Sequence, residues 1–224
     1  MTNPQLWIFG AGSLARLAKF YFQNDVCRPV TGFVVDDNHL SAASSDLGKV
    51  VGWTEFKETI SATEVELFPA VGYKSMRARE VSYQRLVTSK ASLCNLVCKD
   101  AYIASDARLG SGVFIMPGVV IEPGVTIGDN NVFWSNSTVC HDSTIGNHNF
   151  FSAGTVVGGG ARVSARCFFG FSSVVAQYVH VGSDVLVGSH AFLKKNAESA
   201  GAYLGVPAVL KYSINSTDGV SVSP

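Results

Sequence analysis

The chain has 224 residues, enough for one large domain or two small ones with a sizeable core. Lys plus Arg equals Asp plus Glu, so the formal net charge is zero, and the composition does not favour nucleic acid or an anionic membrane surface as a partner. No apolar run reaches the ~18 residues of a membrane span, and the amino-terminal segment lacks the features of a signal peptide. The five cysteines are odd in number and scattered among apolar neighbours, so we expect reduced, buried thiols in a cytoplasmic protein. Cys94 and Cys98 lack CxxC spacing and a second pair, so we expect no metal site.

The first predicted elements are a strand, a glycine turn and a helix, within "QLWIFGAGSLARLAKFYFQND". Gly10 and Gly12 belong to the turn, and Ser13 is the predicted N-cap. "VTGFVVDD" is predicted as a second strand that ends in Asp36 and Asp37. Such a βαβ unit is typical of nucleotide-binding domains, because the turn and the helix N-terminus offer N–H groups to a phosphate. A structural βαβ unit without a ligand is the alternative, since a lone G-x-G-x-x-A is a weak signal.

A further strand and helix complete the predicted first domain. "VELFPAVGY" is predicted as a strand that ends at Gly72 and Tyr73, and "SMRAREVSYQRLV" as the helix that follows. The domain is close to half of a dinucleotide-binding fold in length, so it favours a nucleotide over NAD.

From Ile103 to Leu193, an apolar residue recurs at every sixth position. This period fits neither an α-helix nor a lone strand, but it fits a solenoid whose unit is a short strand and a turn. A small or modest residue stands two positions before each apolar residue, and glycine often follows it, as at Gly128 and Gly146. We expect these glycines to relax the backbone at the bends.

The pattern resembles the hexapeptide repeat of left-handed parallel β-helix acyltransferases, whose unit is [LIV]-G-x-x-x-x. With the short Rossmann-like domain, the chain up to about Leu210 resembles the NeuD/PglD-type sugar O- and N-acyltransferases of bacterial glycan assembly. The matching segments are "IFGAGSLA", "VVDD", "AVGYKSMR", "NSTVCHD" and "YLGVPAVLK". The implied fold is an α/β Rossmann-like βαβ domain at residues 1–99 and a left-handed parallel β-helix at residues 100–210. The polar residues 211–224 predict a disordered tail.

The resemblance implies a nucleotide-sugar site in the first domain and acetyl-CoA along the β-helix, between the subunits of a homotrimer. The implied nucleotide-sugar residues are Gly10, Gly12 and Ser13 beside the phosphates, Asp36 and Asp37 near the base, and Gly72 and Tyr73 along the same cleft. Corner aromatic residues give the trimer a physical reason, because subunit contacts would remove them from water. These aromatic residues are Phe133, Trp134, Phe150 and Phe168.

The resemblance implies that His141 is the catalytic base, in a pattern N-x-x-x-[VI]-x-H-[DE] that begins at Asn136. A neutral imidazole, with an ordinary pKa of ~6.5, can take the proton that an attacking amine or hydroxyl loses. Asp142 is expected to fix the tautomer and stabilise the imidazolium. Gly158 to Gly160 follow one coil later, and we assign the Gly159 N–H as the donor to the oxyanion. The alternative is that His141 is a solvent-facing corner residue.

Lys194 and Lys195 follow the last apolar repeat position, where two ammonium groups would meet the phosphates of CoA. A solvated charge pair is the alternative for these lysines. The predicted cofactor-binding set is Gly158, Gly170, Gly188, Lys194, Lys195 and Pro207.

Two positions depart from the family pattern. Phe150 stands where relatives often carry a second histidine, and Ser13 and Leu14 stand where many relatives have G-G-H in the first turn. The predicted function is N-acetylation of a nucleotide-linked amino-sugar, such as a 4-amino-4,6-dideoxy sugar, in bacterial surface glycan biosynthesis. The alternatives are a sugar O-acetyltransferase of the sialic acid type and an inactive scaffold that binds a nucleotide-sugar.

Overall fold

The computed structural model describes residues 4–42, 47–59, 65–89, 91–198, 200–215 and 217–222. The chain divides into two compact units. The first unit comprises Met1–Gly72 and Val81–Leu96, and the second comprises Tyr73–Glu80 and Val97–Pro224. Residues 73–80 therefore group with the second unit, whereas the predicted domain boundary lay near residue 99. Within the described residues, no helix is long and apolar enough to cross a bilayer.

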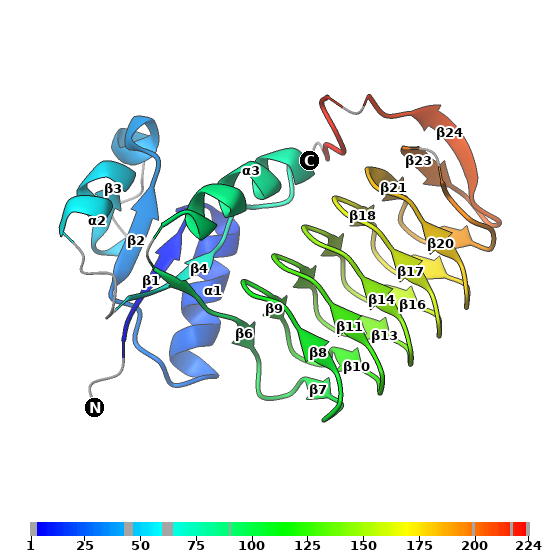
Figure 1. Ribbon diagram of the computed structural model, residues 1–224, viewed down its shortest axis with the longest axis horizontal. Coiled ribbons are helices and arrows are strands. Elements are labelled where there is room, and N and C mark those ends of the chain that lie inside the picture. Colours follow the sequence, from blue (N-terminus) through cyan, green and yellow to red (C-terminus); the bar gives the residue numbers. More distant parts are fainter. Residues whose placement is uncertain are drawn as a thin grey trace. The chain divides into compact units, whose positions relative to one another are not determined.

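The first unit contains a five-stranded parallel sheet with the strand order β3-β2-β1-β4-β5 (Figure 1). Its strands β1, β2 and β4 consist almost entirely of buried residues, as is typical of a parallel sheet covered on both faces. The elements are β1 (Gln5–Phe9), α1 (Ser13–Asn24), β2 (Gly32–Val35), a 3-10 helix (Asp37–Ala42), β3 (Val50–Gly52), α2 (Trp53–Thr59), β4 (Val65–Pro69), the later part of α3 (Met76–Val87) and β5 (Ser92–Leu93).

Two boundaries in the first unit differ from the prediction. The N-cap of α1 is Gly12, and no side chain caps the helix, so Ser13 is its first residue. The glycine turn itself provides the capping position. Strand β4 ends at Pro69, before the expected Gly72 and Tyr73, because its partner β1 ends at Phe9, the residue that pairs with Pro69.

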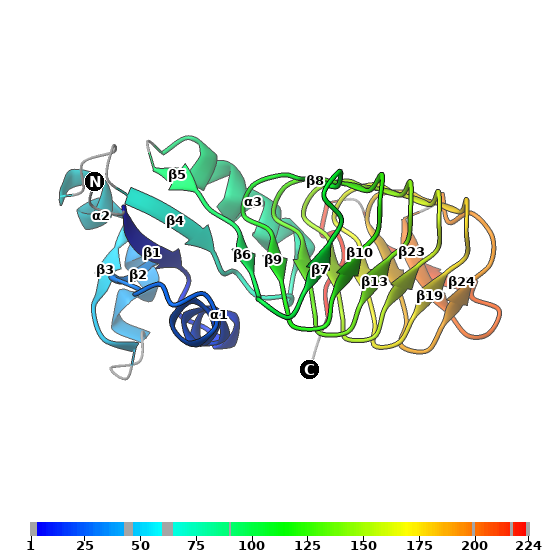
Figure 2. The same ribbon diagram turned by 90° about the horizontal axis from the view of Figure 1, so that it is seen from below.

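The second unit is a left-handed parallel β-helix whose coils stack along one axis (Figure 2). Its strands are β6 (Leu96–Val97), β7 (Tyr102–Ile103), β8 (Arg108–Leu109), β9 (Phe114–Ile115), β10 (Val120–Ile121), β11 (Thr126–Ile127), β12 (Val132–Phe133), β13 (Thr138–Val139), β14 (Thr144–Ile145), β15 (Phe150–Phe151), β16 (Val156–Val157), β17 (Arg162–Val163), β18 (Phe168–Phe169), β19 (Val174–Val175), β20 (His180–Val181), β21 (Val185–Val187), β22 (Phe192–Leu193), β23 (Gly201–Leu204) and β24 (Val209–Ser213).

Three sheets form the sides of this β-helix. Their strand orders are β22-β19-β16-β13-β10-β7, β20-β17-β14-β11-β8 and β24-β23-β21-β18-β15-β12-β9-β6. Val120 pairs with Thr138 and Ile121 with Val139, so one coil contains three six-residue units. The apolar positions of the repeat point inward and form one continuous core, in which every sixth residue from Ile115 to Leu193 is buried.

The corners of the β-helix have a left-handed backbone at regular intervals, for example at Gly118, Asn136 and Asp142. Glycine, asparagine and aspartate tolerate this conformation better than most residues do. The glycines that follow the inward positions have another role: a Cβ on Gly146 would lie 2.6 Å from the Ser164 carbonyl oxygen. The prediction that they relax the bends is therefore wrong. They allow the backbones of adjacent coils to approach closely.

The carboxyl-terminal residues that the structure describes are ordered, contrary to the predicted tail. Strand β24 pairs antiparallel with β23. Val220 is fully buried, and its carbonyl oxygen accepts a hydrogen bond of 3.0 Å from the Met76 N–H. Burial of this apolar side chain outweighs the polar composition of the segment.

The reason given for a trimer is wrong for three of its four aromatic residues, whereas the fourth, Trp134, is half-buried. Phe133 points into the core, and Phe150 and Phe168 are buried within the second unit, so no partner subunit is needed to cover them. The five cysteines are free; Cys98 and Cys167 are buried as expected, but Cys27 is exposed.

Candidate active site

His141 lies on a corner of the β-helix, shortly after β13. Its Nδ1 is 2.9 Å from Asp142 Oδ2, because the left-handed backbone of Asp142 (φ 59°) brings two adjacent side chains together. The His141 N–H donates a hydrogen bond of 2.8 Å to Glu122 Oε2 in the preceding coil. Sequence reasoning missed Glu122, although an acidic residue about one coil before a candidate base is a visible signal.

The two carboxylates favour the protonated form of His141. Its pKa is raised above the ordinary value, first by the hydrogen bond with Asp142 and then by the charges of Asp142 and Glu122, while desolvation opposes the shift. The side chain is 57% exposed, so water screens these interactions. A neutral imidazole that donates Nδ1–H to Asp142 keeps a lone pair on Nε2.

The imidazole leans over the glycine run of the next coil. A Cβ on Gly159 would lie 2.6 Å from His141 Nε2. The Gly160 N–H donates to the His141 carbonyl oxygen at 2.8 Å, and the Gly158 N–H donates to the Val175 carbonyl oxygen at 2.9 Å. The backbone beneath Nε2 thus has no side chain to obstruct a reactant.

Asn136, the other member of the predicted pattern, lies one hexapeptide earlier. Its backbone is left-handed (φ 60°), and its N–H donates to the Pro117 carbonyl oxygen at 3.2 Å. Its side-chain oxygen occupies the space beside Gly118 that a Cβ there would fill. Asn136 therefore forms a separate corner, and the structure does not bring it to His141.

The predicted cofactor residues are spread over the following coils. Lys194 and Lys195 directly follow β22 and are exposed. The close approach of adjacent coils explains the three glycines among them. A Cβ on Gly158 would lie 2.6 Å from the Gln177 nitrogen, and one on Gly170 would lie 2.5 Å from the Ser189 nitrogen. A Cβ on Gly188 would meet the Leu204 side chain. Pro207 lies between β23 and β24.

The predicted phosphate loop lies at the carboxyl end of β1, where open α/β sheets bind ligands. Gly10 has φ +117°, and a Cβ there would lie 2.7 Å from the Ala70 carbonyl oxygen. The backbone conformation and the close approach to Ala70 therefore both require glycine at this position. A Cβ on Gly12 would meet nothing within 4 Å, which leaves the helix start at Ser13 uncovered on that side.

The two acidic residues after β2 are engaged in the fold of the first unit. Asp37 accepts hydrogen bonds from the Thr54 N–H at 3.1 Å and the Thr54 hydroxyl at 2.8 Å, and the bond from the backbone N–H is the main cause of its lowered pKa. Asp36 forms an ion pair with Arg85, whose guanidinium lies 5.0 Å from the ring of Trp53. Sequence reasoning did not identify Arg85.

Gly72 and Tyr73 fall on opposite sides of the division between the units. A Cβ on Gly72 would meet nothing within 4 Å. The ring of Tyr73 packs within the second unit, 5.2 Å from Phe150 and 6.2 Å from Phe168 between centroids. Its position is thus defined by the β-helix.

Comparison with known proteins agrees with this fold. Residues 106–141 and 124–159 match the family of bacterial transferase hexapeptide repeats. Residues 106–159 of this chain therefore match the hexapeptide repeats of that family. An acyl-[acyl-carrier-protein]–UDP-N-acetylglucosamine O-acyltransferase from Rhizobium leguminosarum is 33% identical over 84 residues. That match covers 38% of this chain, and the chain spans about a third (31%) of the length of the relative.

Several solved structures resemble this chain over nearly its whole length. PerB from Caulobacter crescentus, in complex with CoA and GDP-perosamine, is 25% identical, with a TM-score of 0.82 over 93% of this chain and 97% of that one. The acetyltransferase domain of PglB from Neisseria gonorrhoeae is 22% identical, with a TM-score of 0.81 over 93% of this chain and all of that one. WeeI from Acinetobacter baumannii is 18% identical, with a TM-score of 0.81 over 92% and 99%. The resemblance to NeuD/PglD-type proteins is confirmed.

Position 150 of this chain is a phenylalanine and not a histidine, and its buried ring packs against Tyr73 and Trp134. His148, in the adjacent part of the repeat, lies at another corner. Its Nδ1 is 3.0 Å from Asn130 Nδ2, and burial lowers its pKa to about 4. His148 is therefore a buried neutral residue that contacts Asn130 at that corner.

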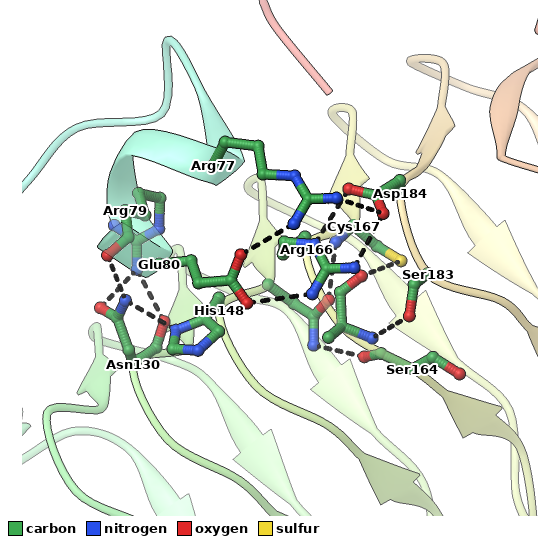
Figure 3. A network of polar contacts seen from close by, with 12 residues as sticks. Arg77, Arg79, Glu80, Asn130, His148, Ser164, Arg166, Cys167, Ser183 and Asp184 are labelled. Atoms are coloured by element: carbon green, nitrogen blue, oxygen red, sulfur yellow. Dashed lines mark hydrogen bonds and ion pairs between the residues drawn. The ribbon is translucent and has the colours of Figure 1, made fainter. Parts of the chain in front are cut away.

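A partly buried polar network lies around His148 (Figure 3). Arg79 donates to the Asn130 carbonyl oxygen at 2.7 Å and to Asn130 Oδ1 at 3.0 Å. Arg166 pairs with Asp184 at 2.8 Å and with Glu80 at 3.0 Å. Because Arg79 and Glu80 belong to the start of α3, the network fastens this turn to the corner of the β-helix. The contacts of this network indicate that its residues stabilise the fold.

Proposed function

We propose that this protein is an acyltransferase that transfers the acetyl group of acetyl-CoA to the amino group of a nucleotide-linked amino-sugar. The observation that carries the proposal is the pairing of His141 with Asp142 through Nδ1, with Nε2 directed over the bare backbone of Gly159. PerB, solved with CoA and GDP-perosamine, supports both substrate classes.

In the proposed reaction, the nitrogen of the amino-sugar attacks the thioester carbonyl carbon, and His141 Nε2 takes the proton that the nitrogen loses. The charge that Asp142 and Glu122 place near the ring stabilises the imidazolium as it forms. The tetrahedral intermediate then collapses, the carbon–sulfur bond breaks, and the imidazolium returns a proton to the CoA thiolate. The products are the amide and CoA.

The oxyanion of the intermediate needs a donor close to the reacting carbon. Gly158 and Gly160 use their N–H groups in hydrogen bonds between coils. Gly159 lies between them, directly below Nε2, and we assign its N–H to the oxyanion. Lys194 and Lys195, exposed after β22, are assigned to the phosphates of CoA.

We assign the nucleotide to the first unit. The turn at Gly10 and Gly12 precedes the N-terminus of α1, which favours a phosphate. The rest of the proposal follows the family resemblance: a 4-amino-4,6-dideoxy sugar as acceptor, a cytoplasmic homotrimer, and a role in bacterial surface glycan biosynthesis.

A sugar hydroxyl is the second candidate acceptor, because the Rhizobium relative that matches over 84 residues is an O-acyltransferase. His141 would remove the proton from a hydroxyl in the same way. An inactive scaffold is disfavoured by the intact pair of His141 and Asp142.

The test is to incubate the protein with acetyl-CoA and a panel of UDP-, dTDP- and GDP-linked 4-amino-sugars and to measure product mass. We expect one acceptor to gain one acetyl group, and His141→Ala to lose the activity. His180→Ala, at an exposed histidine on β20, is the matched control and should retain it. Product on hydroxyl sugars alone would favour O-acetylation, and no product on either class would favour the scaffold.

A further inference from the structure

Tyr178 is an exposed aromatic residue at the corner that carries Asp142. It is 73% exposed, and its backbone is left-handed, with φ 60°. Among the described non-glycine residues with positive φ, Tyr178 alone is a phenylalanine, tyrosine or tryptophan. This conformation is costly for a bulky residue and is typical of functional sites.

The ring of Tyr178 lies over Gly160, in the coil between Tyr178 and Asp142. A Cβ on Gly160 would lie 2.5 Å from Cδ1 and 2.6 Å from Cε1 of the ring. The Tyr178 N–H also donates to the Gly159 carbonyl oxygen at 2.9 Å. The ring is thus directed back toward the coil of His141, and it can lie there only because residue 160 has no side chain.

His141 and Tyr178 lean over the same glycine pair from opposite directions. The imidazole comes from the preceding coil onto Gly159, and the phenol ring comes from the following coil onto Gly160. Consecutive Cα atoms are ~3.8 Å apart. The hydrogen bond between His141 and Asp142 shows that successive side chains converge at this corner. The imidazole and the ring therefore flank the same pair of consecutive glycines.

We propose that Tyr178 is the residue that limits the acyl donor to a small acyl group, an inference that rests on the proposed function. The carbon under attack must lie within reach of a nucleophile that touches Nε2 above Gly159, so the acyl chain extends beside the Tyr178 ring above Gly160. A two-carbon acyl group fits beside the ring, whereas a longer chain meets its edge. One methylene in an apolar pocket changes selectivity by ~10- to 200-fold.

The test compares kcat/KM for acetyl-CoA and butyryl-CoA with one acceptor. Tyr178→Asn removes the ring and suits the left-handed backbone, as Asn130 and Asn136 do at other corners. We expect it to lower the acetyl-to-butyryl ratio by ~10-fold or more, and Tyr178→Phe to keep the wild-type ratio. Tyr102→Asn, at an exposed tyrosine on β7, is the matched control and should also keep it.

An unchanged ratio in Tyr178→Asn would overturn the inference, as would an equal loss in Tyr178→Phe, which would assign the effect to the hydroxyl. If the wild-type protein acylates no acceptor, titration calorimetry with both thioesters replaces the kinetic ratio. Binding without a change of preference in Tyr178→Asn would then refute only the role of Tyr178. No binding of either thioester to the wild-type protein would refute the proposed function and the inference together.

Discussion

His141 and His148 lie in neighbouring hexapeptides, yet their surroundings shift their pKa values in opposite directions. His141 is exposed beside two carboxylates, which stabilise its charged form. His148 is buried, and desolvation lowers its pKa to about 4, more strongly than Glu80 and Asp129 raise it. A residue that must gain and lose a proton near neutral pH fits the first environment. This contrast explains why we assign the catalytic proton to His141.

The charge of Asp142 should be visible in the pH dependence of catalysis. The base must be neutral to act, so kcat/KM should fall as the pH drops through a His141 pKa that lies above its ordinary value. Asp142→Asn removes the carboxylate, which lowers that pKa and moves the acidic limb to lower pH. We also expect the plateau to fall by ~10- to 100-fold, because the imidazolium loses its partner. Measured pH–rate profiles between about pH 5 and 9 check both effects.

Asp218→Asn, at an exposed aspartate near the carboxyl terminus, is the control and should leave the profile unchanged. An acidic limb at the same pH in wild-type protein and Asp142→Asn would show that Asp142 does not set the pKa of the base.

At the scale of elements, the glycines that follow the inward-pointing positions should contribute to the stability of the β-helix, because they let adjacent coils approach closely. Gly146→Ala places a Cβ 2.6 Å from the Ser164 carbonyl oxygen, which belongs to the backbone of the next coil. The coil spacing is set by the hydrogen bonds between strands, so the backbone cannot move aside cheaply. We expect a loss of about 1–3 kcal/mol in the free energy of unfolding, measured by urea denaturation.

Gly72→Ala is a suitable comparison, because a Cβ there would meet nothing within 4 Å. Its free energy of unfolding should stay within about 0.5 kcal/mol of the wild-type value. Equal stability of Gly146→Ala and Gly72→Ala would contradict the close-stacking role.

The six-residue period predicted the β-helix because every sixth side chain points into the core and must be apolar. It did not show what the glycines do, since their contacts are with residues about one coil away. The first unit was harder to predict: β3 has three residues and α2 has seven, too few for periodicity to show. The position of Tyr178 was missed for a similar reason, because its contact with Gly160 depends on how successive coils stack.

At the scale of the whole molecule, the candidate site could be predicted in part. A local motif identified His141 and Asp142, whose side chains do meet at 2.9 Å. The same motif included Asn136, which lies on a different corner because each hexapeptide turns the chain by one side of the triangle. The network around Arg79 could not be predicted, since an arginine in a helix ordinarily faces solvent. Its burial depends on α3 beginning beside the corner formed by Asn130 and His148.

That network should make the stability of the protein depend on pH. His148 has a pKa of about 4 in the folded state and an ordinary value of 6.5 when unfolded. Between these values the unfolded chain binds more protons, so stability falls as the pH falls from about 6.5 to about 4. The shift corresponds to a loss of at most about 3 kcal/mol. Arg79 and Arg166 add to the cost of protonation, while Glu80 and Asp129 reduce it.

Urea denaturation at a series of pH values, for wild-type protein and His148→Asn, measures this contribution. Asparagine suits the left-handed backbone at this position, as Asn130 does one coil earlier, and it cannot be protonated in this range. We expect the variant to lose less stability than the wild-type protein between pH 6.5 and about 4. His180→Asn, at an exposed histidine on β20, should keep the wild-type slope. The same slope in wild-type protein and His148→Asn would mean that carboxylates elsewhere, and not the buried imidazole, govern the acid sensitivity of the fold.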